Sequence, residues 1–284
     1  MEGYIPRSNS SIPLNNTVKE TKDVFQVINP VLNAFDPISL EEMDKVKLMN
    51  RIDTKFLISQ EQLPYLLKRA LGQYRVVEID GLRACPYSSI YFDTEDFYMY
   101  TVHHNGKLNR YKIRMRSYIN SGISFLEVKR KSNKGRTSKK RIKIDVRNFQ
   151  GVFLNEEEQI FIQEKSPFSY VDLRPSLQNF FNRITLVDKD ETERVTIDVN
   201  LQFRPVGAES YNGVNGLVII EMKQDGAAKS HFREYLNELS VLPIGMSKYC
   251  LGMILTNPAV KSNRFKKKIR YINKLTNSDL LAVR

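Results

Sequence analysis

The stretch Arg110–Tyr118 reads RYKIRMRSY, and its alternation decides the fold. Lys112, Arg114 and Arg116 fall on one face of an extended chain, because successive side chains of a strand point to opposite faces. The aliphatic residues between them fall on the other face. The stretch is therefore predicted to be a β-strand with one cationic face and one aliphatic face.

The same alternation recurs in other segments, so it is a property of a sheet rather than of one strand. Solvation of the charged side explains a single strand of this kind. It explains a whole set less well, because the chain has enough predicted helices to cover the aliphatic side. We therefore predict an α+β fold in which a closed antiparallel β-barrel has a basic polar interior and helices packed outside. The other segments are RIDTKFLI (51–58), FLEVKRK (125–131), KRIKIDVR (140–147), RVTIDVNLQ (194–202) and VIIEMK (218–223).

The charge balance points to an anionic partner. The chain has 284 residues, with 44 Lys and Arg against 32 Asp and Glu, and a formal net charge of +12. A positive interior shielded from water needs an anion for stability, because buried charges without partners are costly. A large and highly charged anion such as triphosphate fits this requirement.

Carboxylates on the same faces suggest a divalent cation. Glu127, Asp198 and Glu221 alternate in phase with Lys and Arg. Mg²⁺ and Mn²⁺ take oxygen ligands from protein, phosphate and water, and phosphoryl transfer uses both metal and protein cations. The alternative is that these carboxylates form internal salt bridges that hold the barrel together.

The ordered motifs RIDTKFLI, YFDTEDFYMY, YKIRMRSY, LEVKRK, RVTIDVNLQF, VIIEMKQ and SKYCLGM resemble the VTC domain. This is the polyphosphate polymerase branch of the CYTH-like triphosphate tunnel metalloenzymes. The resemblance implies an eight-stranded antiparallel tunnel barrel that uses Mn²⁺ or Mg²⁺. It also implies transfer of the γ-phosphate of ATP onto a growing polyphosphate chain.

The resemblance also assigns roles to individual residues. Many tunnel enzymes carry ExExK on the first strand, whereas Arg51, Asp53 and Lys55 occupy that spacing here, so the metal stoichiometry stays open. Glu221 matches the metal-binding glutamate, with Glu127 and Asp198 in support. The implied phosphate contacts are Lys55, Arg114, Arg116, Lys129, Arg194 and Lys248, with Lys223, Arg183 and Tyr111 as weaker candidates.

Composition and helix signals predict the domain organisation. We expect a flexible N-terminal arm at 1–37, a tunnel domain at 38–256 and a basic C-terminal helix or tail at 257–284. The tail either is a solvated helix or contacts an anionic membrane, polyphosphate or a partner. Helices are expected at 38–50, 60–71, 155–165 and 230–240, and again after Ser247.

Cysteine usage and hydropathy bear on the compartment. Cys85 and Cys250 are widely spaced and are expected to be free thiols. No apolar leader or long apolar run is apparent, which predicts a soluble cytoplasmic protein. His103 and His104 are expected to be exposed turn residues rather than metal ligands.

Several functions remain open at this point. A polyphosphate polymerase is the first hypothesis, and a triphosphatase of the same fold is the second. A non-catalytic polyphosphate-binding module is the third. Nucleic-acid binding is not expected, because the basic residues alternate with aliphatic residues rather than with exposed aromatic side chains that stack on bases.

Overall fold

The computed structural model describes residues 23–45, 51–134, 137–149, 151–153, 155–226 and 229–280. Most of the expected N-terminal arm, at 1–22, lies outside the described residues. The same holds for 46–50, the last part of the helix expected at 38–50, and for the end of the basic tail at 281–284.

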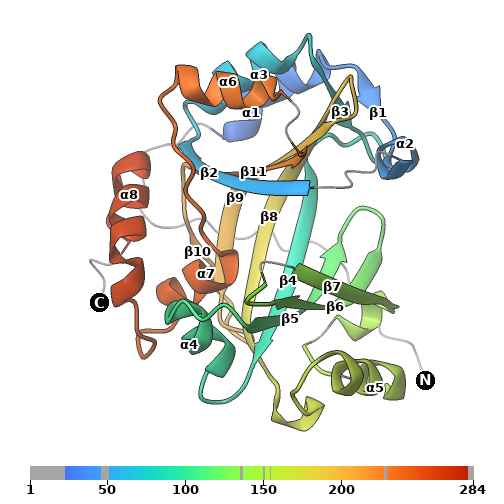
Figure 1. Cartoon of the computed structure of the whole chain (residues 1–284), viewed down its shortest axis with the longest axis vertical. Helices are drawn as coiled ribbons and strands as arrows, with labels where there is room; N and C mark the ends of the chain where they lie inside the picture. The colour runs from blue at the N-terminus through green and yellow to red at the C-terminus, as the bar shows by residue number, and fades with distance from the viewer. Residues whose placement is uncertain are drawn as a thin grey trace, which may run out of the picture.

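Helices and strands alternate irregularly along the chain (Figure 1). The strands are β1 (Pro37–Ile38), β2 (Arg51–Ser59), β3 (Tyr74–Val77), β4 (Cys85–Asp93), β5 (Arg110–Tyr118), β6 (Ile123–Lys131), β7 (Thr137–Ile144), β8 (Arg174–Asp188), β9 (Glu193–Arg204), β10 (Asn212–Gly213) and β11 (Leu217–Asp225). The α-helices are α1 (Val24–Asn33), α2 (Leu40–Lys45), α3 (Leu63–Ala70), α4 (Tyr98–His104), α5 (Glu156–Lys165), α6 (His231–Glu238), α7 (Lys248–Thr256) and α8 (Lys266–Thr276).

One large sheet organises the fold. Its main strand order is β2-β11-β9-β8-β4-β5-β6-β7, and every neighbouring pair in this order is antiparallel. Of the shorter strands, β3 pairs with β8, β10 pairs with β9 and β1 pairs with β3, and together they complete an 11-stranded sheet. Within the described part of the chain, no ladder joins β2 to β7, so the sheet is not closed by hydrogen bonds. The α+β class is confirmed, but the closed barrel is not.

The aliphatic face of β2, β11, β9 and β8 lies beneath a layer of helices. Ile197 and Ile220 are fully buried there. They pack in one cluster with Leu66 of α3, Ile28 of α1 and Phe232 of α6. Figure 1 shows α1, α3 and α6 together at the top of the molecule. The predicted covering of the aliphatic side is therefore confirmed for this half of the sheet.

The aliphatic face of the other half packs against α5. Ile113, Met115 and Leu126 are fully buried in a cluster that includes Phe161 and Ile162 of α5. Asn155 caps α5 by accepting a hydrogen bond from the backbone N–H of Glu158, at 2.9 Å, so this helix begins where it is expected.

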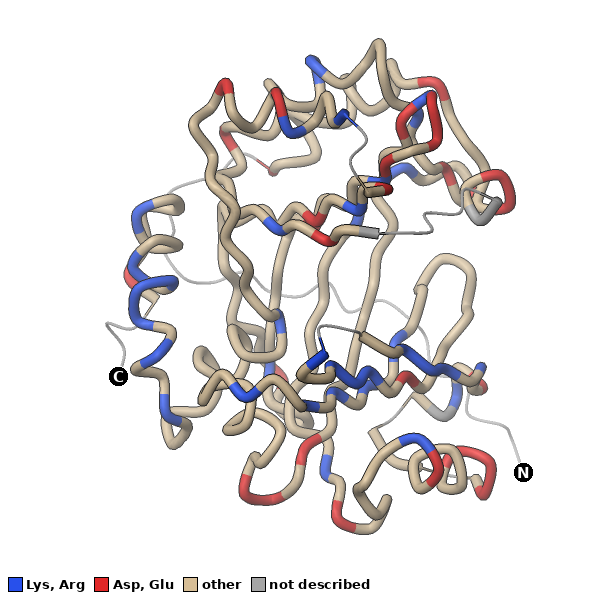
Figure 2. The backbone as a smooth tube through the Cα atoms, viewed as in Figure 1, with Lys and Arg blue, Asp and Glu red and all other residues tan. Residues whose placement is uncertain are grey.

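The helices α7 and α8 pack on the opposite face of the sheet. Tyr249 and Leu251 of α7 share an apolar cluster with Leu57 of β2 and Phe181 of β8, and Ile272 of α8 joins the same cluster. One face of α8 is therefore buried, while its lysines remain on the outer side, where Figure 2 shows them in blue. No described helix is long and apolar enough to cross a bilayer.

The described structure departs from the sequence-based expectations in several places. Residues 24–33 form α1 rather than a loose arm, with Ile28 and Leu32 buried. The strand predicted at 140–147 ends at Ile144, because Asp145 instead accepts a hydrogen bond from the backbone N–H of Arg147, at 2.8 Å. The two cysteines are free, as expected, and both are buried.

Candidate functional site

Strand register brings the predicted charged residues to one face of the sheet, which we call the charged face. Glu221 of β11 lies opposite Lys55 of β2, and Arg183 of β8 lies opposite Asp198 of β9. Because cross-strand partners point to the same side, the alternation noted in each segment adds up across the sheet. The predicted residues on this face are Lys55, Arg114, Arg116, Glu127, Lys129, Arg183, Arg194, Asp198, Glu221 and Lys223.

The sheet curls so that distant strands approach each other across this face. Lys129 of β6 interacts electrostatically with Glu221 of β11 and with Lys55 and Asp53 of β2. These strands lie near opposite ends of the strand order. Figure 2 shows Lys and Arg gathered on β5, β6 and β7, with acidic and basic positions on β2 and β11 above them. The charged groups therefore converge rather than spread over a flat surface.

Asp198 joins two elements through ion pairs. Its carboxylate accepts two hydrogen bonds from the guanidinium of Arg183, at 2.6 and 2.8 Å, and it also pairs with Lys248 at the start of α7. The Asp198 side chain is 3% exposed. Burial alone raises the pKa of Asp198, but the two cations hold it well below its usual range. Asp198 is therefore ionised, and its negative charge is matched locally.

Glu127 has a similar environment on the other half of the sheet. Its carboxylate pairs with Arg114 of β5, at 2.6 Å, and with Lys139 of β7. Burial opposes ionisation, but Arg114, Arg116 and Lys139 lower the pKa of Glu127 to about 2. Lys139 was not among the candidates from sequence, because the alternation of the segment 140–147 begins one residue after it.

Glu221 is the most accessible of the three carboxylates. Its side chain is 20% exposed, against 2% for Glu127 and 3% for Asp198. It pairs with Lys55, and burial is outweighed by Lys55 and Lys223, which lower the pKa of Glu221 to about 2. Glu221 is therefore ionised at neutral pH and open to further ligands.

The carboxylates do not form a metal cage by themselves. Among the described residues, no group of three or more His, Cys, Asp or Glu side chains could hold a metal ion. Mg²⁺ and Mn²⁺ do not require such a group when they bind together with phosphates, because one or two carboxylates, phosphate oxygens and water complete their coordination. Of the predicted ligands, Glu221 fits this role best, whereas Glu127 and Asp198 are occupied by ion pairs.

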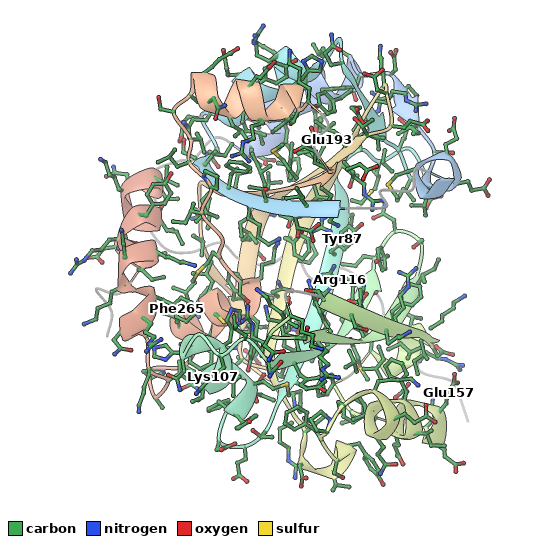
Figure 3. All side chains as sticks on the ribbon, viewed as in Figure 1. Tyr87, Lys107, Arg116, Glu157, Glu193 and Phe265 are labelled. Atoms are coloured by element: carbon green, nitrogen blue, oxygen red, sulfur yellow. The ribbon has the colours of Figure 1, made fainter. Side chains whose placement is uncertain are left out.

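Arg116 is a buried cation with only neutral polar and aromatic contacts. It is 6% exposed, and its Nε atom donates a hydrogen bond to the hydroxyl of Ser89, at 3.1 Å. Its guanidinium lies over the rings of Tyr87 and Phe181, at 5.7 and 5.6 Å from their centroids. Figure 3 shows Arg116 and Tyr87 near the middle of the molecule. The described part of the chain shows no ion pair to Arg116. Burial and nearby Arg114 lower the pKa of Arg116, and the electrostatic effect of Glu127 opposes them only in part.

Three contacts fix the start of α7 against the charged face. Lys112 donates a hydrogen bond from Nζ to the hydroxyl of Ser247, at 3.0 Å, and burial lowers the pKa of Lys112 to about 8. Tyr249 donates a hydrogen bond to Asp93 and stacks on Tyr91, with ring centroids 5.1 Å apart. These contacts hold Lys248, which lies between Ser247 and Tyr249 in the chain, in position to reach the charged face.

Other residues lie away from their expected places. Tyr111 packs against the apolar cluster on the opposite face of the sheet, rather than with Lys112 and Arg114. The expectation that His103 and His104 are exposed turn residues is wrong, because both belong to α4 and His104 is 5% exposed. His103 instead has its Nδ1 atom 3.1 Å from the sulfur of Cys250 on α7.

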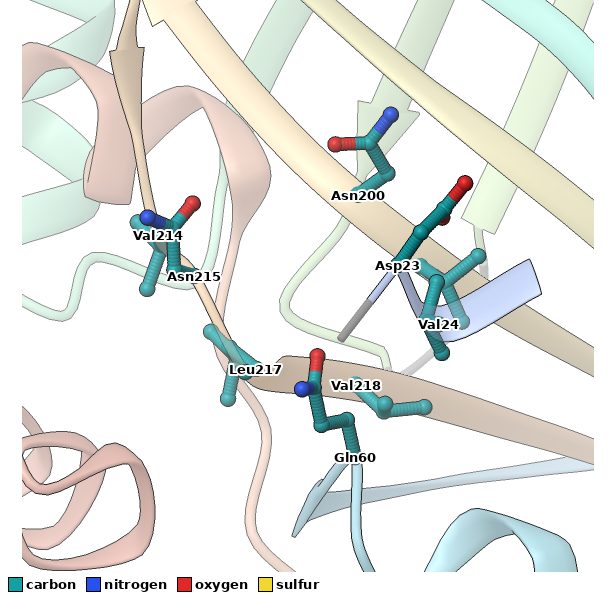
Figure 4. Close-up of a pocket in the computed structure, with 10 residues that line it drawn as sticks. Asp23, Val24, Gln60, Asn200, Val214, Asn215, Leu217 and Val218 are labelled. Carbon is teal, nitrogen blue, oxygen red and sulfur yellow. The ribbon is translucent and has the colours of Figure 1, made fainter. Parts of the chain in front are cut away.

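The described residues form at least two pockets outside the charged face. The smaller pocket, of about 130 Å³, lies between the start of α1 and strands β9 and β11 (Figure 4). Of the described residues that line this pocket, only Asp23 is charged, so the pocket does not suit an anion. The larger pocket, of about 480 Å³, lies between α4, the start of β5 and the end of β6.

The chain matches one family model and several solved structures. The family model described as VTC domain matches residues 50–257. Similar solved structures include a Bacillus halodurans protein described as a candidate adenylate cyclase, which is 15% identical with a TM-score of 0.46, over 77% of this chain and 100% of that chain. A Vibrio parahaemolyticus protein with the same description is 10% identical with a TM-score of 0.41, over 72% and 99% of the two chains.

A third structure comes from Hippeastrum and is described as a candidate adenylyl cyclase with a dominant triphosphatase activity. It is 14% identical with a TM-score of 0.43, over 72% of this chain and 96% of that chain. No curated protein matches the chain at a significant level.

Proposed function

Because the chain belongs to the VTC domain family, we propose that it is a metal-dependent polyphosphate polymerase. Its charged face binds the triphosphate of ATP and the end of a polyphosphate chain. The reaction breaks the bond between the β- and γ-phosphates of ATP and forms a new bond between the γ-phosphorus and a terminal phosphate oxygen of the chain. ADP leaves, and the polymer is one phosphate longer.

Arg116 is the observation that carries this proposal. Buried charges in proteins are paired, because moving an ion out of water costs several kcal/mol, on the order of 5. Arg116 forms no ion pair with a described residue, and its close contacts are a hydroxyl and two aromatic rings. Glu127 acts on it electrostatically, but this carboxylate is already paired with Arg114 and Lys139, so the charge of Arg116 is only partly balanced within the described residues. A phosphate chain on the charged face supplies the remaining negative charge.

The neighbouring cations suit a transferring phosphoryl group. Arg114, Arg183 and Lys248 are already held by carboxylates in ion pairs, so little reorganisation is needed when phosphate binds. Lys129 lies across the face from Lys55. Cations in such an arrangement stabilise charge on the phosphoryl oxygens in the transition state.

The nucleophile distinguishes the polymerase from its alternatives. A terminal phosphate of polyphosphate is already ionised, so it needs no protein general base. Water in the same place would make the protein a triphosphatase. A divalent metal, when bound with Glu221 and phosphate oxygens, supplies Lewis-acid stabilisation of the phosphates. We also propose that the sheet encloses the charged face as a closed barrel and that the protein is cytoplasmic.

The test is an assay of products. Purified protein is incubated with ATP and Mn²⁺, and the products are separated into long polyphosphate and orthophosphate. Long polyphosphate supports the polymerase, orthophosphate alone supports the triphosphatase, and binding without turnover supports the non-catalytic module. Absence of both turnover and triphosphate binding would overturn the proposal.

Variants test the assigned roles. Glu221→Gln should lose metal-dependent turnover and keep its fold, because Glu221 is the accessible carboxylate. Arg114→Ala and Lys129→Ala should lose turnover and bind tripolyphosphate less tightly. Lys165→Met on α5, outside the charged face, is the matched control for removal of one positive charge. Full activity of Glu221→Gln would show that the metal assignment is wrong.

A further inference from the structure

The larger pocket lies directly behind one end of the charged face. We call it the aromatic pocket; its lining includes Tyr98, Arg110, Tyr111, Arg130 and Phe168. Tyr111 of β5 lies opposite Arg130 of β6 in the strand register. The next pair along the two strands, Lys112 and Lys129, lies on the charged face. The aromatic pocket and the charged face are therefore separated by the end of one strand pair.

Aromatic rings form much of the pocket wall. The ring of Phe168 lies edge-on to that of Tyr98 and to that of Tyr111, with centroid separations of 6.0 Å in both cases. Tyr98 is 52% exposed, which is unusual for a large aromatic side chain in a concave site. A volume of about 480 Å³ is in the range of small-molecule sites. The pocket therefore offers exposed ring surface for stacking.

The positive charge of the pocket favours an anionic ligand. Arg130 lies with its guanidinium carbon 5.8 Å from the centre of the Tyr111 ring, and Arg110 is a second cation in the lining. Among the described residues that line the pocket, none is Asp or Glu. The preferred occupant is thus a flat aromatic group attached to an anion. Besides burial, Arg110 in the pocket also lowers the pKa of Lys112 on the charged face. The positive charges of the pocket and of the charged face therefore act on each other.

We propose that the aromatic pocket binds the nucleobase of a nucleoside triphosphate whose phosphates lie on the charged face beyond Lys112 and Lys129. This inference rests on the proposed function, and it makes a nucleotide rather than inorganic triphosphate the preferred donor. Tyr98 stacks on the base, and Arg110 and Arg130 lie near the α-phosphate end of the triphosphate. The pocket thereby orients the nucleotide so that its γ-phosphate points along the charged face.

The chain itself offers a clean probe, because it contains no tryptophan. Tyr98→Trp places a single indole at the exposed wall of the pocket. Titration with ATP should quench or shift its fluorescence, and titration with inorganic tripolyphosphate should not. An equal response to both ligands, or no response to ATP at a concentration that saturates binding, overturns the inference.

Affinities give a second and independent test. Tyr98→Ala should weaken ATP binding by about fivefold to a hundredfold, because stacking of one base contributes about 1–3 kcal/mol. Its affinity for tripolyphosphate should equal that of the unaltered protein. Tyr98→Phe should retain ATP binding, since it keeps the ring. Tyr65→Ala, at a 41% exposed tyrosine on α3, is the matched control.

The outcomes separate this inference from the proposed function. Unchanged ATP affinity in Tyr98→Ala, with tripolyphosphate still bound, overturns the nucleobase site and leaves the phosphate site standing. Loss of affinity for both ligands in this variant also overturns it, because the pocket would then not distinguish a nucleotide from inorganic triphosphate. Absence of binding of either ligand to the unaltered protein overturns both.

Discussion

Arg116→Met tests whether the buried guanidinium needs a bound anion. Methionine keeps a long unbranched side chain and removes the charge. Burial of this guanidinium, which has no ion pair among the described residues, costs several kcal/mol, on the order of 5, and attraction to Glu127 offsets part of that cost. Against this, the hydrogen bond to Ser89 contributes about 1.5–3 kcal/mol. The contacts with Tyr87 and Phe181 contribute about 0.5–2 kcal/mol each. Without anion, the free energy of unfolding should therefore change by less than about 2 kcal/mol, since costs and gains nearly cancel.

With anion, the two proteins should differ clearly. Tripolyphosphate at a hundred times its Kd stabilises the unaltered protein by about 2.7 kcal/mol. If Arg116→Met binds tenfold more weakly, the same concentration stabilises it by about 1.4 kcal/mol. Urea unfolding followed by circular dichroism, with and without tripolyphosphate, measures both quantities. A variant that is strongly destabilised without anion, yet gains as much from tripolyphosphate as the unaltered protein, would refute the reasoning.

Two further predictions concern stability. The folded-state pKa of Glu127, about 2, lies below its ordinary value of 4.5. The ion pairs of Glu127 therefore stabilise the protein above about pH 4.5, and this stabilisation is lost as the pH falls towards 2. The difference in unfolding free energy between the unaltered protein and Glu127→Gln should therefore shrink as the pH falls; a constant difference contradicts this. In Gly252→Ala, the added Cβ would lie 2.4 Å from Leu177 and 2.5 Å from Phe203, both fully buried, so overpacking should cost about 1–3 kcal/mol in thermal or urea unfolding. Gly72→Ala, with no atom within 4 Å of the new Cβ, is its control, and equal stabilities would contradict the prediction.

The faces of the strands could be predicted from sequence because side-chain alternation is a local property. Ile113 and Met115 are fully buried, as the pattern in RYKIRMRSY requires. Ile52 shows the limit of the rule, because it alternates correctly in RIDTKFLI but is 54% exposed. It lies near the start of β2, and β2 ends the strand order. Burial depends on what covers a face, and the alternation does not contain that information.

The helix α4 could not be found from its own residues. Its sequence, YMYTVHH, is rich in aromatic and β-branched residues, which are typical of strands. Asp93 at the end of β4 instead accepts hydrogen bonds from the backbone N–H groups of Met99 and Tyr100, at 2.8 and 2.9 Å, and stabilises the helix start. Asp93 lies before the helix, in a segment whose sequence predicts a strand. Tertiary context therefore decides that residues 98–104 form a helix.

The pairing of charges within the site was also beyond the sequence. Alternation places Glu127 and Arg114 on the same kind of face, but strand register makes them cross-strand partners. Register is set by turns and by irregularities such as the shift between Phe180 and Asn182 of β8, which a period-two pattern does not reveal. The contact between Cys250 and His103 joins two helices and has no local signal at all.

The arrangement of the ion pairs explains how the charged face can favour phosphate without collapsing by repulsion. Asp198 connects Arg183 of β8 with Lys248 of α7. Glu127 connects Arg114 of β5 with Lys139 of β7. Each buried acid therefore fixes cations from two elements. These acids neutralise part of the positive charge and hold the donors in place before any ligand binds. The remaining excess includes Arg116, which is buried and forms no ion pair with a described residue. An anion that binds there meets oriented donors and relieves repulsion between them, and both effects favour phosphate over water.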